Sequence, residues 1–332
     1  MSAIGNNEDD EELLMRYLTE AQVAALLPVG DAIVALEEAF LALAGGTAQV
    51  RPRQRVHLPT SVLQVMPAGL TTASATGLGL KAYVSGRGGT RFAFLLFDPQ
   101  DGRLLALMEA NQLGQIRTGA ASGLATKYMA RDDAQTVGII GTGWQARSQL
   151  AAVCAVRPIR QARCYSRDAL RREQFARDMS AHLSMAVSAA PDARAVVDGA
   201  DIVITITSAR EPVFDGAGLA AGTHVNAAGI NQAAKREIDD TTIQRASTIA
   251  VDLLEQARGE CGDLIAAEQA GAFHWEQAVE LASIVSGAVP VRSNRDDITL
   301  FESQGIALED VAVGMLVYRR AMEQGIGVDL PV

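Results

Sequence analysis

A glycine-rich turn between an apolar run and a small-residue helix is the segment best suited to bind an anion. Residues Val137 to Ala146 read VGIIGTGWQA. Gly141 would permit the tight bend, Gly143 would let the backbone approach a pyrophosphate, and the small Ala146 would let helix and strand pack. A helix over 146–156 would direct its N-terminus at the anion. A purely structural turn is the alternative. We predict a dinucleotide site whose cofactor-binding residues are Gly141, Thr142, Gly143, Trp144, Gln145 and Ala146.

The residues after the next expected strand, 162–165, bear on the choice of cofactor. They are Ser166, Arg167 and Asp168. An acid at this place accepts the ribose 2′-hydroxyl of NAD, whereas a basic residue accommodates the 2′-phosphate of NADP. Ser166 replaces that acid and Arg167 follows it, which favours NADP(H) over NAD(H). Asp168 is either the ribose acid after a one-residue slip or the N-cap of the following helix.

A basic window lies earlier in the chain. Residues 39–97 contain no Asp or Glu, yet they include Arg51, Arg53, Arg55, Lys81, Arg87 and Arg91. Guanidinium groups pair with carboxylates through two parallel hydrogen bonds, so a pocket for a small anion is one interpretation. The other is a strand-rich segment with its arginines on a solvated face. Composition does not choose between them.

Hydrophobic patterns divide the chain into two kinds of structure. The first third predicts helices over 20–27 and 31–44, and strands over 62–66, 79–84, 92–98 and 104–109, with turns at 67–69, 86–89 and 98–102. A helix over 118–129 then leads to regular strand–helix alternation, with strands at 162–165, 186–188, 202–207, 224–228 and 248–251. A last helical segment, 298–325, is expected to pack on the first domain.

This alternation requires a parallel sheet with both faces covered. We therefore predict an α/β protein, with a Rossmann-type doubly wound parallel sheet over residues 128–299. The second unit is an α+β domain formed by residues 1–127 together with 300–332.

Composition limits the classes of function. The 332 residues are 48% hydrophobic and 20% charged, with a net charge of −10, which argues against nucleic acid as a partner. The acidic stretch 6–12 reads as a solvated arm, and we expect neither a leader nor a membrane span, hence a cytoplasmic protein. The three cysteines and four histidines lack the spacing of metal ligands, so no metal site is expected.

The chain resembles the ornithine cyclodeaminase/μ-crystallin family from about Tyr17 to its C-terminus. Eight segments carry the resemblance by their order and spacing: 51–55 (RPRQR), 65–68 (VMPA), 79–81 (GLK), 115–122 (QIRTGAAS), 141–143 (GTG), 225–229 (VNAAG), 235–239 (KREID) and 298–303 (ITLFES).

Membership would imply a substrate pocket around the basic window. Arg53 and Arg117 would hold an α-carboxylate, and Lys81 would lie near the α-nitrogen, where a lysine of lowered pKa can donate or accept a proton. Gln64 and Met66 are further expected substrate contacts. Without the resemblance, a solvent-facing Arg117 and a strand-edge Lys81 would be the simpler interpretations.

The resemblance also bears on the cofactor side and on assembly. We expect the cofactor to contact Thr118, Thr207, Ser208, Asn231 and Asp252, with Asp252 beside the nicotinamide. A homodimer built on the sheet of the first domain is implied, although the apolar strands of 62–109 could instead fill a monomer's own core.

Two departures from the cyclodeaminase pattern guide the choice of reaction. Asn231 stands where that pattern places a carboxylate, and Gln64 stands where it places a second acid. An amide cannot serve as a general base, which makes ornithine cyclisation doubtful. Imine reduction remains possible because the cofactor supplies the hydride. Lys81 and Asn231 are the predicted catalytic residues.

The expected function is thus that of an NAD(P)H-dependent imino-acid (ketimine) reductase or amino-acid dehydrogenase. It would act as an oxidoreductase at the α-carbon of a small amino or imino carboxylate. Two alternatives stay open: an ornithine cyclodeaminase-type ammonia lyase with bound NAD, and a non-catalytic NADPH-binding crystallin-like protein.

Overall fold

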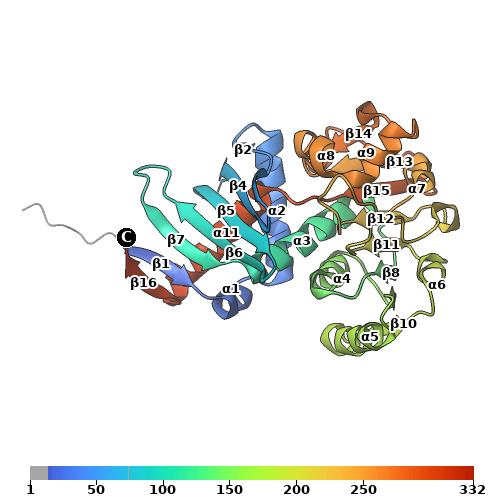
Figure 1. Ribbon diagram of the computed structural model, residues 1–332, viewed down its shortest axis with the longest axis horizontal. Helices are drawn as coiled ribbons and strands as arrows, with labels where there is room; N and C mark the ends of the chain where they lie inside the picture. Colours follow the sequence, from blue (N-terminus) through green and yellow to red (C-terminus); the bar gives the residue numbers. More distant parts are fainter. Residues whose placement is uncertain (1–13, 74) are drawn as a thin grey trace, which may run out of the picture.

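The described part of the chain contains two eight-stranded sheets joined by a long helix (Figure 1). The computed structural model describes residues 14–73 and 75–332, so the acidic arm expected at 6–12 lies outside the described residues. The joining helix is α3 (Asn111–Met129), which contacts β6 of the first sheet and β12 and β15 of the second. No helix in the described part of the chain combines the length and apolar character that a membrane crossing needs.

The first sheet is mostly antiparallel. Its order is β16 (Val328–Pro331), β1 (Leu14–Leu18), β7 (Leu104–Glu109), β6 (Gly89–Phe97), β5 (Thr76–Gly86), β4 (Ser61–Thr71) and β2 (Ala48–Val50), and β3 (Gln54–Leu58) also pairs with β4. Its helices are α1 (Glu20–Leu26), α2 (Val29–Ala44) and α11 (Ala307–Gln324). Helix α11 packs on β4, β5 and β6. Along β5, buried residues alternate with exposed or half-buried ones, so Lys81 and Tyr83 point to the covered face.

The second sheet is entirely parallel. Its order is β10 (Ala186–Ala189), β9 (Gln161–Tyr165), β8 (Thr136–Ile140), β11 (Ile202–Thr205), β12 (His224–Ala227), β15 (Ile298–Glu302), β13 (Ala246–Val251) and β14 (Ala278–Glu280). The chain runs outward from β8 through β9 to β10 and then returns to β11 on the other side of β8. This reversal makes a topological switch point at the carboxyl end of β8, which is where such sheets bind ligands. The fold is a Rossmann-type doubly wound sheet with an α+β domain, as predicted.

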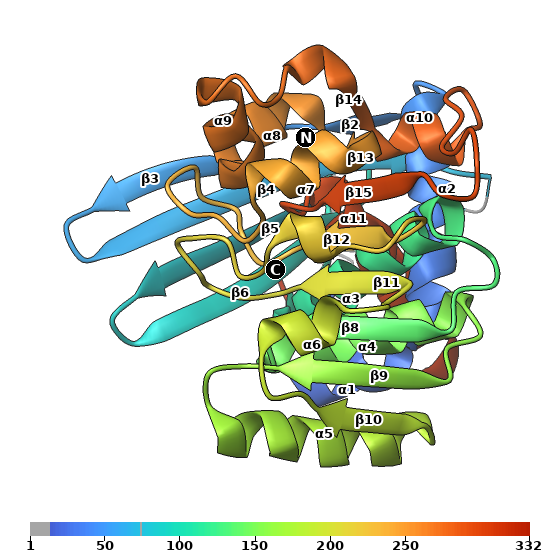
Figure 2. The ribbon, with the colours of Figure 1, turned by 90° about the vertical axis from the view of Figure 1, so that its right-hand side faces the viewer.

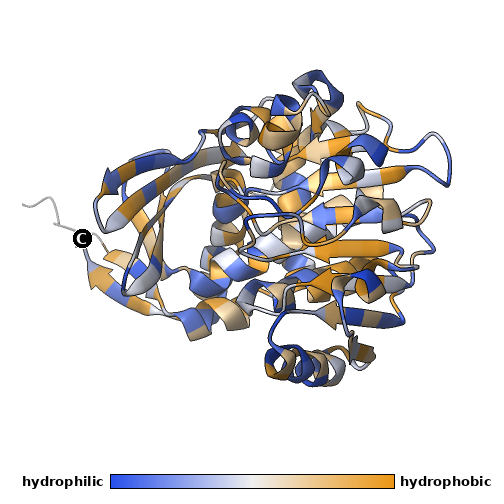
Figure 3. Cartoon of the chain, turned by 45° about the vertical axis from the view of Figure 1, so that its right-hand side comes forward, coloured by the Kyte–Doolittle hydropathy of each residue, from blue (hydrophilic) through white to orange (hydrophobic). Residues whose placement is uncertain are grey.

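Helices surround the parallel sheet (Figure 2). They are α4 (Trp144–Val156), α5 (Ala169–Leu183), α6 (Ala193–Val197), α7 (Asp240–Arg245), α8 (Leu254–Glu260), α9 (Gly262–Gln269) and α10 (Leu281–Val285), with short 3-10 turns at Gly216–Gly218 and Trp275–Gln277. Apolar residues concentrate along the central strands, whereas α5, at the bottom of the view, is largely hydrophilic (Figure 3). The strands of a doubly covered sheet are expected to be apolar in this way.

Two predicted helical segments were wrong in extent. Helix α3 begins at Asn111 rather than at 118, because Glu20 accepts hydrogen bonds from the backbone N–H groups of Asn111 (2.7 Å) and Gln112 (2.6 Å). This cap comes from 91 residues earlier in the chain, so no local signal marks it. The segment 298–325 is not all helical, because its first five residues form β15 inside the parallel sheet, across the predicted boundary at 299/300.

The expected turn at 67–69 lies inside strand β4. Pro67 falls between the residues of β4 that pair with β3 and those that pair with β2, so its missing N–H interrupts neither ladder. Strands β1, β2, β3, β14 and β16 were not predicted. Each has only three to five residues, which is too short for periodicity to identify.

Candidate active site

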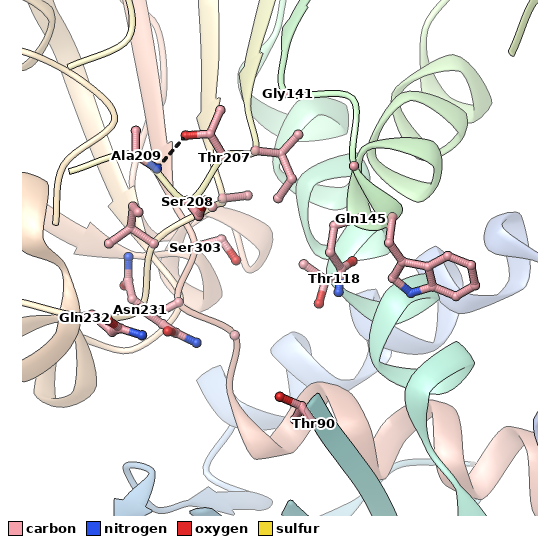
Figure 4. A pocket seen from close by; sticks show the side chains of 18 of the residues that line it. Thr90, Thr118, Gly141, Gln145, Thr207, Ser208, Ala209, Asn231, Gln232 and Ser303 are labelled. Atoms are coloured by element: carbon pink, nitrogen blue, oxygen red, sulfur yellow. Dashed lines mark hydrogen bonds between the residues drawn. The ribbon is translucent and has the colours of Figure 1, made fainter. Parts of the chain in front are cut away.

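A cavity of about 1760 Å³ lies between the two sheets. On one side it is lined by the carboxyl ends of the parallel strands and the loops that follow them. On the other side it is lined by the covered face of β3, β4, β5 and β6 and by the first turns of α3. Figure 4 shows side chains from both sides pointing into the same space. The predicted cofactor and substrate segments therefore meet in one place.

The glycine turn has the geometry of an anion cradle. Gly141 has a φ of +110°, and a Cβ built there would lie 2.2 Å from the carbonyl oxygen of Ile206. Gly143 is the N-cap of α4, and nothing lies within 4 Å of the position of its missing Cβ. The backbone at Gly143 is therefore open to a ligand, directly before the positive end of a helix. This arrangement fits a dinucleotide pyrophosphate.

The neighbours of this turn divide into two groups. Thr118, Thr142, Trp144 and Gln145 line the cavity, and Trp144 is 53% exposed. Figure 4 shows Thr118 and Gln145 in the cavity wall. Ala146 is fully buried and does not line the cavity, so its place is in the helix–strand contact rather than at the cofactor. The prediction that Ala146 binds the cofactor is corrected accordingly.

Ser166 and the residues after it lie at the β9 side of the switch point. Thr142 donates a hydrogen bond from Oγ1 to Ser166 Oγ at 2.8 Å. Asp168 is the N-cap of α5 and accepts a hydrogen bond from the backbone N–H of Arg171 at 3.1 Å. Of the two roles considered for Asp168, it has the capping role. Arg167 and Arg171 also line this end of the cavity.

Lys81 forms the charged centre of the opposite wall. Its side chain is 2% exposed, and Nζ lies 2.8 Å from Oδ1 and 2.7 Å from Oδ2 of Asp310. Burial and the positive charge of Arg117 lower the pKa of Lys81 to about 7, against the opposing effect of Asp310. A lysine with this pKa exchanges a proton readily at neutral pH.

Arg117 lies beside this pair with part of its guanidinium group free. Nε donates to Asp310 Oδ1 at 3.0 Å and Nη1 donates to Glu309 Oε2 at 2.7 Å. Nη2 has no partner among the described residues, so its two N–H groups are available to a carboxylate. Gly305, with a φ of +72°, allows this placement, because a Cβ there would lie 2.2 Å from Nη1.

Arg53 lines the cavity, but the protein occupies most of its donors. Nη1 contacts Glu260 Oε2 at 2.5 Å, and Nη2 donates to the carbonyl oxygens of Gln304 (2.9 Å) and Gly305 (3.0 Å). The free guanidinium edge that a substrate carboxylate requires is therefore on Arg117. Met66, a predicted substrate contact, is fully buried with its sulfur 3.3 Å from Arg53 Nε and does not line the cavity. That prediction is corrected.

Glu260 links the two domains through ion pairs with two arginines of the cavity wall. It pairs with Arg53 and, at 2.6 Å, with Arg55, which also donates to the backbone carbonyl of Asn231 at 3.1 Å. Sequence reasoning missed Glu260, Glu309 and Asp310. The acids of the first turn of α11 resemble ordinary helix-start residues, and only the fold brings them under Lys81 and Arg117.

A neutral row of side chains extends the floor of the cavity beyond Lys81. Tyr83 donates from its hydroxyl to Gln64 Oε1 at 2.7 Å, and Gln64 Nε2 donates to Ser85 Oγ at 3.3 Å. All three residues line the cavity. The predicted contact residue Gln64 is thus present in the cavity wall, with its amide held by neighbouring polar groups.

The loops after β11 and β12 form the remaining wall. Thr207, Ser208 and Asn231 line the cavity, as Figure 4 shows. Asp252 does not. It is 1% exposed and accepts hydrogen bonds from the backbone N–H groups of Gln304 and Gly305, each at 2.7 Å. Asp252 therefore supports the loop after β15 from behind, and its predicted contact with the nicotinamide is corrected.

Comparisons with known proteins agree with this geometry. Δ1-pyrroline-2-carboxylate reductase of Bacillus cereus is 39% identical over 70% of this chain and 72% of its own. The solved structure of the Thermococcus litoralis Δ1-pyrroline-2-carboxylate reductase in complex with NADH and L-proline is 36% identical, with a TM-score of 0.90, over 95% of this chain and 100% of that one. An archaeal alanine dehydrogenase dimer with bound NAD is 31% identical, with a TM-score of 0.89, over 96% and 99% of the two chains.

The sequence profile of one family spans nearly all of the described chain. It matches residues 14–325, which include the glycine turn, Lys81, Arg117 and the acids of α11. The chain belongs to the ornithine cyclodeaminase/mu-crystallin family.

Proposed function

We propose that this chain is an NAD(P)H-dependent imino-acid reductase acting at the α-carbon of a small imino carboxylate, with amino-acid oxidation as the reverse reaction. The observation that carries the proposal is Lys81, a buried lysine with a pKa lowered to about 7 beside the free edge of Arg117. It shares a cavity with a glycine turn open to a pyrophosphate. Relatives named as reductases and dehydrogenases of imino and amino acids support the same reaction class.

The glycine turn, Arg117 and Lys81 have separate roles in the proposed reaction. Gly141, Gly143 and the start of α4 would hold the cofactor, which would supply a hydride to an imine carbon. Nη2 of Arg117 binds the substrate carboxylate through charge-assisted hydrogen bonds. Lys81 donates the proton that completes reduction of the imine nitrogen and is then reprotonated from solvent. One hydride and one proton thus convert the C=N bond into CH–NH.

The cavity supports reduction over cyclodeamination. The carboxylates that line it in the described chain, Asp168 and Glu211, lie at the ends of β9 and β11 rather than beside Lys81. Gln64 and Asn231 are amides, which cannot take a proton from water or bind a second amino group as a carboxylate would. The row formed by Gln64, Tyr83 and Ser85 suits a neutral substrate side chain.

For the cofactor, we propose a preference for NADPH over NADH. Ser166 leaves the ribose position without an acid, Asp168 caps α5, and Arg167 and Arg171 line this end of the cavity. A 2′-phosphate would be bound by these arginines. The free cysteines Cys154, Cys164 and Cys261 suit a reducing compartment such as the cytoplasm.

A homodimer formed through the first sheet is part of the proposal. The face of this sheet turned away from the cavity carries Val56, Leu63 and Val84 in register on three adjacent strands, 61%, 40% and 46% exposed. An apolar row of this kind favours a protein contact. The dimeric archaeal relative supports a second copy as the partner.

The test is an assay of NADPH oxidation with a panel of substrates: pyrroline-2-carboxylate, piperideine-2-carboxylate, and pyruvate with methylamine, each repeated with NADH. Oxidation with at least one imine, faster with NADPH, is expected. If every imine were inert and ornithine released ammonia without net change in the cofactor, the reductase proposal would be wrong.

A further inference from the structure

Glu237 is a buried carboxylate that the reaction proposed above does not use. It precedes α7, has no solvent exposure and does not line the cavity. Its oxygens make hydrogen bonds to two loops and form no ion pair with any Lys or Arg of the described chain. Removing an ionisable group from water without a cation is costly, so the contacts it makes instead require a reason.

Those contacts join two neighbouring strands at their carboxyl ends. Oε1 accepts a hydrogen bond from the backbone N–H of Thr207 at 2.5 Å, directly after β11. Oε2 accepts one from the backbone N–H of Gly229 at 2.7 Å, directly after β12, and a weaker one from Thr205 Oγ1 at 3.2 Å. A single carboxylate thus fixes both loops, which an amide could not do because it offers one acceptor oxygen.

The clamp depends on close approach at Gly229. A Cβ at this position would lie 2.5 Å from Glu237 Oε2 and 2.4 Å from the carbonyl oxygen of Thr207. Glu237 is itself held in place, because Asp263 Oδ1 accepts from the backbone N–H groups of Glu237 and Ile238, both at 2.8 Å. The carboxylate is therefore a fixed point between the two loops.

The clamped loops lie on one side of the switch point. Thr207 and Gly229 line the cavity on the β11 and β12 side of the glycine turn, whereas Ser166 lies on the β9 side. A dinucleotide bound across a switch point places its two halves on opposite sides. With the adenosine half at Ser166, the nicotinamide half lies against the loops that Glu237 holds.

We propose that Glu237 is a positioning residue for the nicotinamide half of the cofactor, acting through the backbone of Thr207 and Gly229. The inference rests on the proposed function for the identity of the ligand. It assigns Glu237 no contact with substrate or cofactor.

The test compares binding of NADPH with binding of 2′,5′-ADP, which carries only the adenosine half, by titration calorimetry on the full chain. In Glu237→Gln the side-chain NH2 group would face at least one of the two backbone N–H groups. Two donors would then oppose each other, and that hydrogen bond would be lost. The Kd for NADPH should rise by roughly tenfold or more while that for 2′,5′-ADP stays within about twofold of wild type. With an active imine substrate, kcat should fall as well.

Asp201→Asn is the matched control. Asp201 also accepts hydrogen bonds from two backbone N–H groups, those of Gln135 (2.9 Å) and Thr136 (3.0 Å), but at the amino ends of the strands, and it pairs with Arg131. It should lose thermal stability and leave both Kd values unchanged. If Glu237→Gln does not fold, Thr205→Val removes only the third donor, and a two- to threefold rise in the Kd for NADPH alone is expected.

The outcomes separate this inference from the proposed function. If the wild-type chain failed to bind NADPH, both would be overturned. If wild type bound both ligands and Glu237→Gln bound NADPH equally well, only the role of Glu237 would be wrong. Equal weakening of NADPH and 2′,5′-ADP would also contradict it, because general loss of structure would then explain the effect.

Discussion

Both carboxylate oxygens of Asp310 lie within 2.8 Å of Lys81 Nζ, and Oδ1 also accepts from Arg117 Nε at 3.0 Å. One buried carboxylate therefore orients the proposed proton donor and the proposed carboxylate ligand together. The hydrogen bond and the charge of Asp310 limit how far burial lowers the pKa of Lys81. This relationship underlies the first three predictions.

Lys81→Met should reduce kcat for imine reduction by at least about a hundredfold, because the general acid is lost. NADPH should bind as in wild type, since Lys81 is not part of the glycine turn. The control is Lys127→Met, which removes an exposed lysine paired with Glu37, and steady-state kinetics should not change. Full activity of Lys81→Met would show that the proton comes from elsewhere.

The pH dependence follows from the lowered pKa of Lys81. Reduction needs the protonated amine, so kcat for reduction should fall as the pH rises through about 7, and kcat for the reverse oxidation should rise over the same range. In Asp310→Asn the pKa of Lys81 should decrease further, so kcat for reduction should fall at a lower pH than in wild type. If the pH at which kcat falls were the same in Asp310→Asn as in wild type, the pH dependence would not arise from Lys81.

Arg117→Lys keeps the charge but loses the planar guanidinium edge. The KM for an imino carboxylate should rise by roughly tenfold or more, because the ammonium group of lysine cannot offer the two parallel hydrogen bonds that a guanidinium group gives to a carboxylate. The KM for NADPH serves as the internal reference and should stay constant. Equal effects on both KM values would indicate a general disturbance of the cavity.

The sequence predicted the elements around the glycine turn better than the contacts of the basic window. The glycine turn, β8 and α4 are contiguous in the chain, so local pattern was sufficient to predict a strand, a glycine turn and a helix in this order. Asp310 reaches Lys81 from 229 residues away, and Glu260 reaches Arg53 from 207 residues away. Hydrophobic periodicity carries no information about contacts between residues so far apart in the chain. For this reason the sequence did not predict Glu260 and Asp310 as partners of the basic residues.

Asp252 illustrates the opposite error. Its position after a parallel strand suggested a cofactor contact, because strand ends in such sheets carry ligand-binding residues. The loop after β15 instead covers it and satisfies its carboxylate with backbone N–H groups. Whether a polar residue at a strand end faces the ligand or supports the neighbouring loop depends on packing that lies outside its own segment.

Ser166→Asp should reverse the preference between the two cofactors. A carboxylate at this position accepts the ribose 2′-hydroxyl of NADH and repels the 2′-phosphate of NADPH. The ratio of kcat/KM for NADPH to that for NADH should fall by at least about tenfold. A ratio unchanged from wild type would place the 2′-position of the cofactor away from Ser166.

Leu63→Glu should convert a dimer into monomers, because it inserts a charge into the apolar row on the outer face of the first sheet. Light scattering after size exclusion measures the mass directly. Leu170→Glu is the control, since Leu170 is 77% exposed on α5 and should not affect assembly. If wild type were itself monomeric, the proposed interface would be wrong.

The most direct measurement is the transfer of deuterium from NADPD, labelled on the transferable position of the nicotinamide, to the product of an imine such as pyrroline-2-carboxylate. We expect one deuterium on the α-carbon for each cofactor oxidised, with the label detected by mass spectrometry. Product formed without label, or release of ammonia from ornithine with the cofactor unchanged at the end of each turnover, would contradict the proposed reduction.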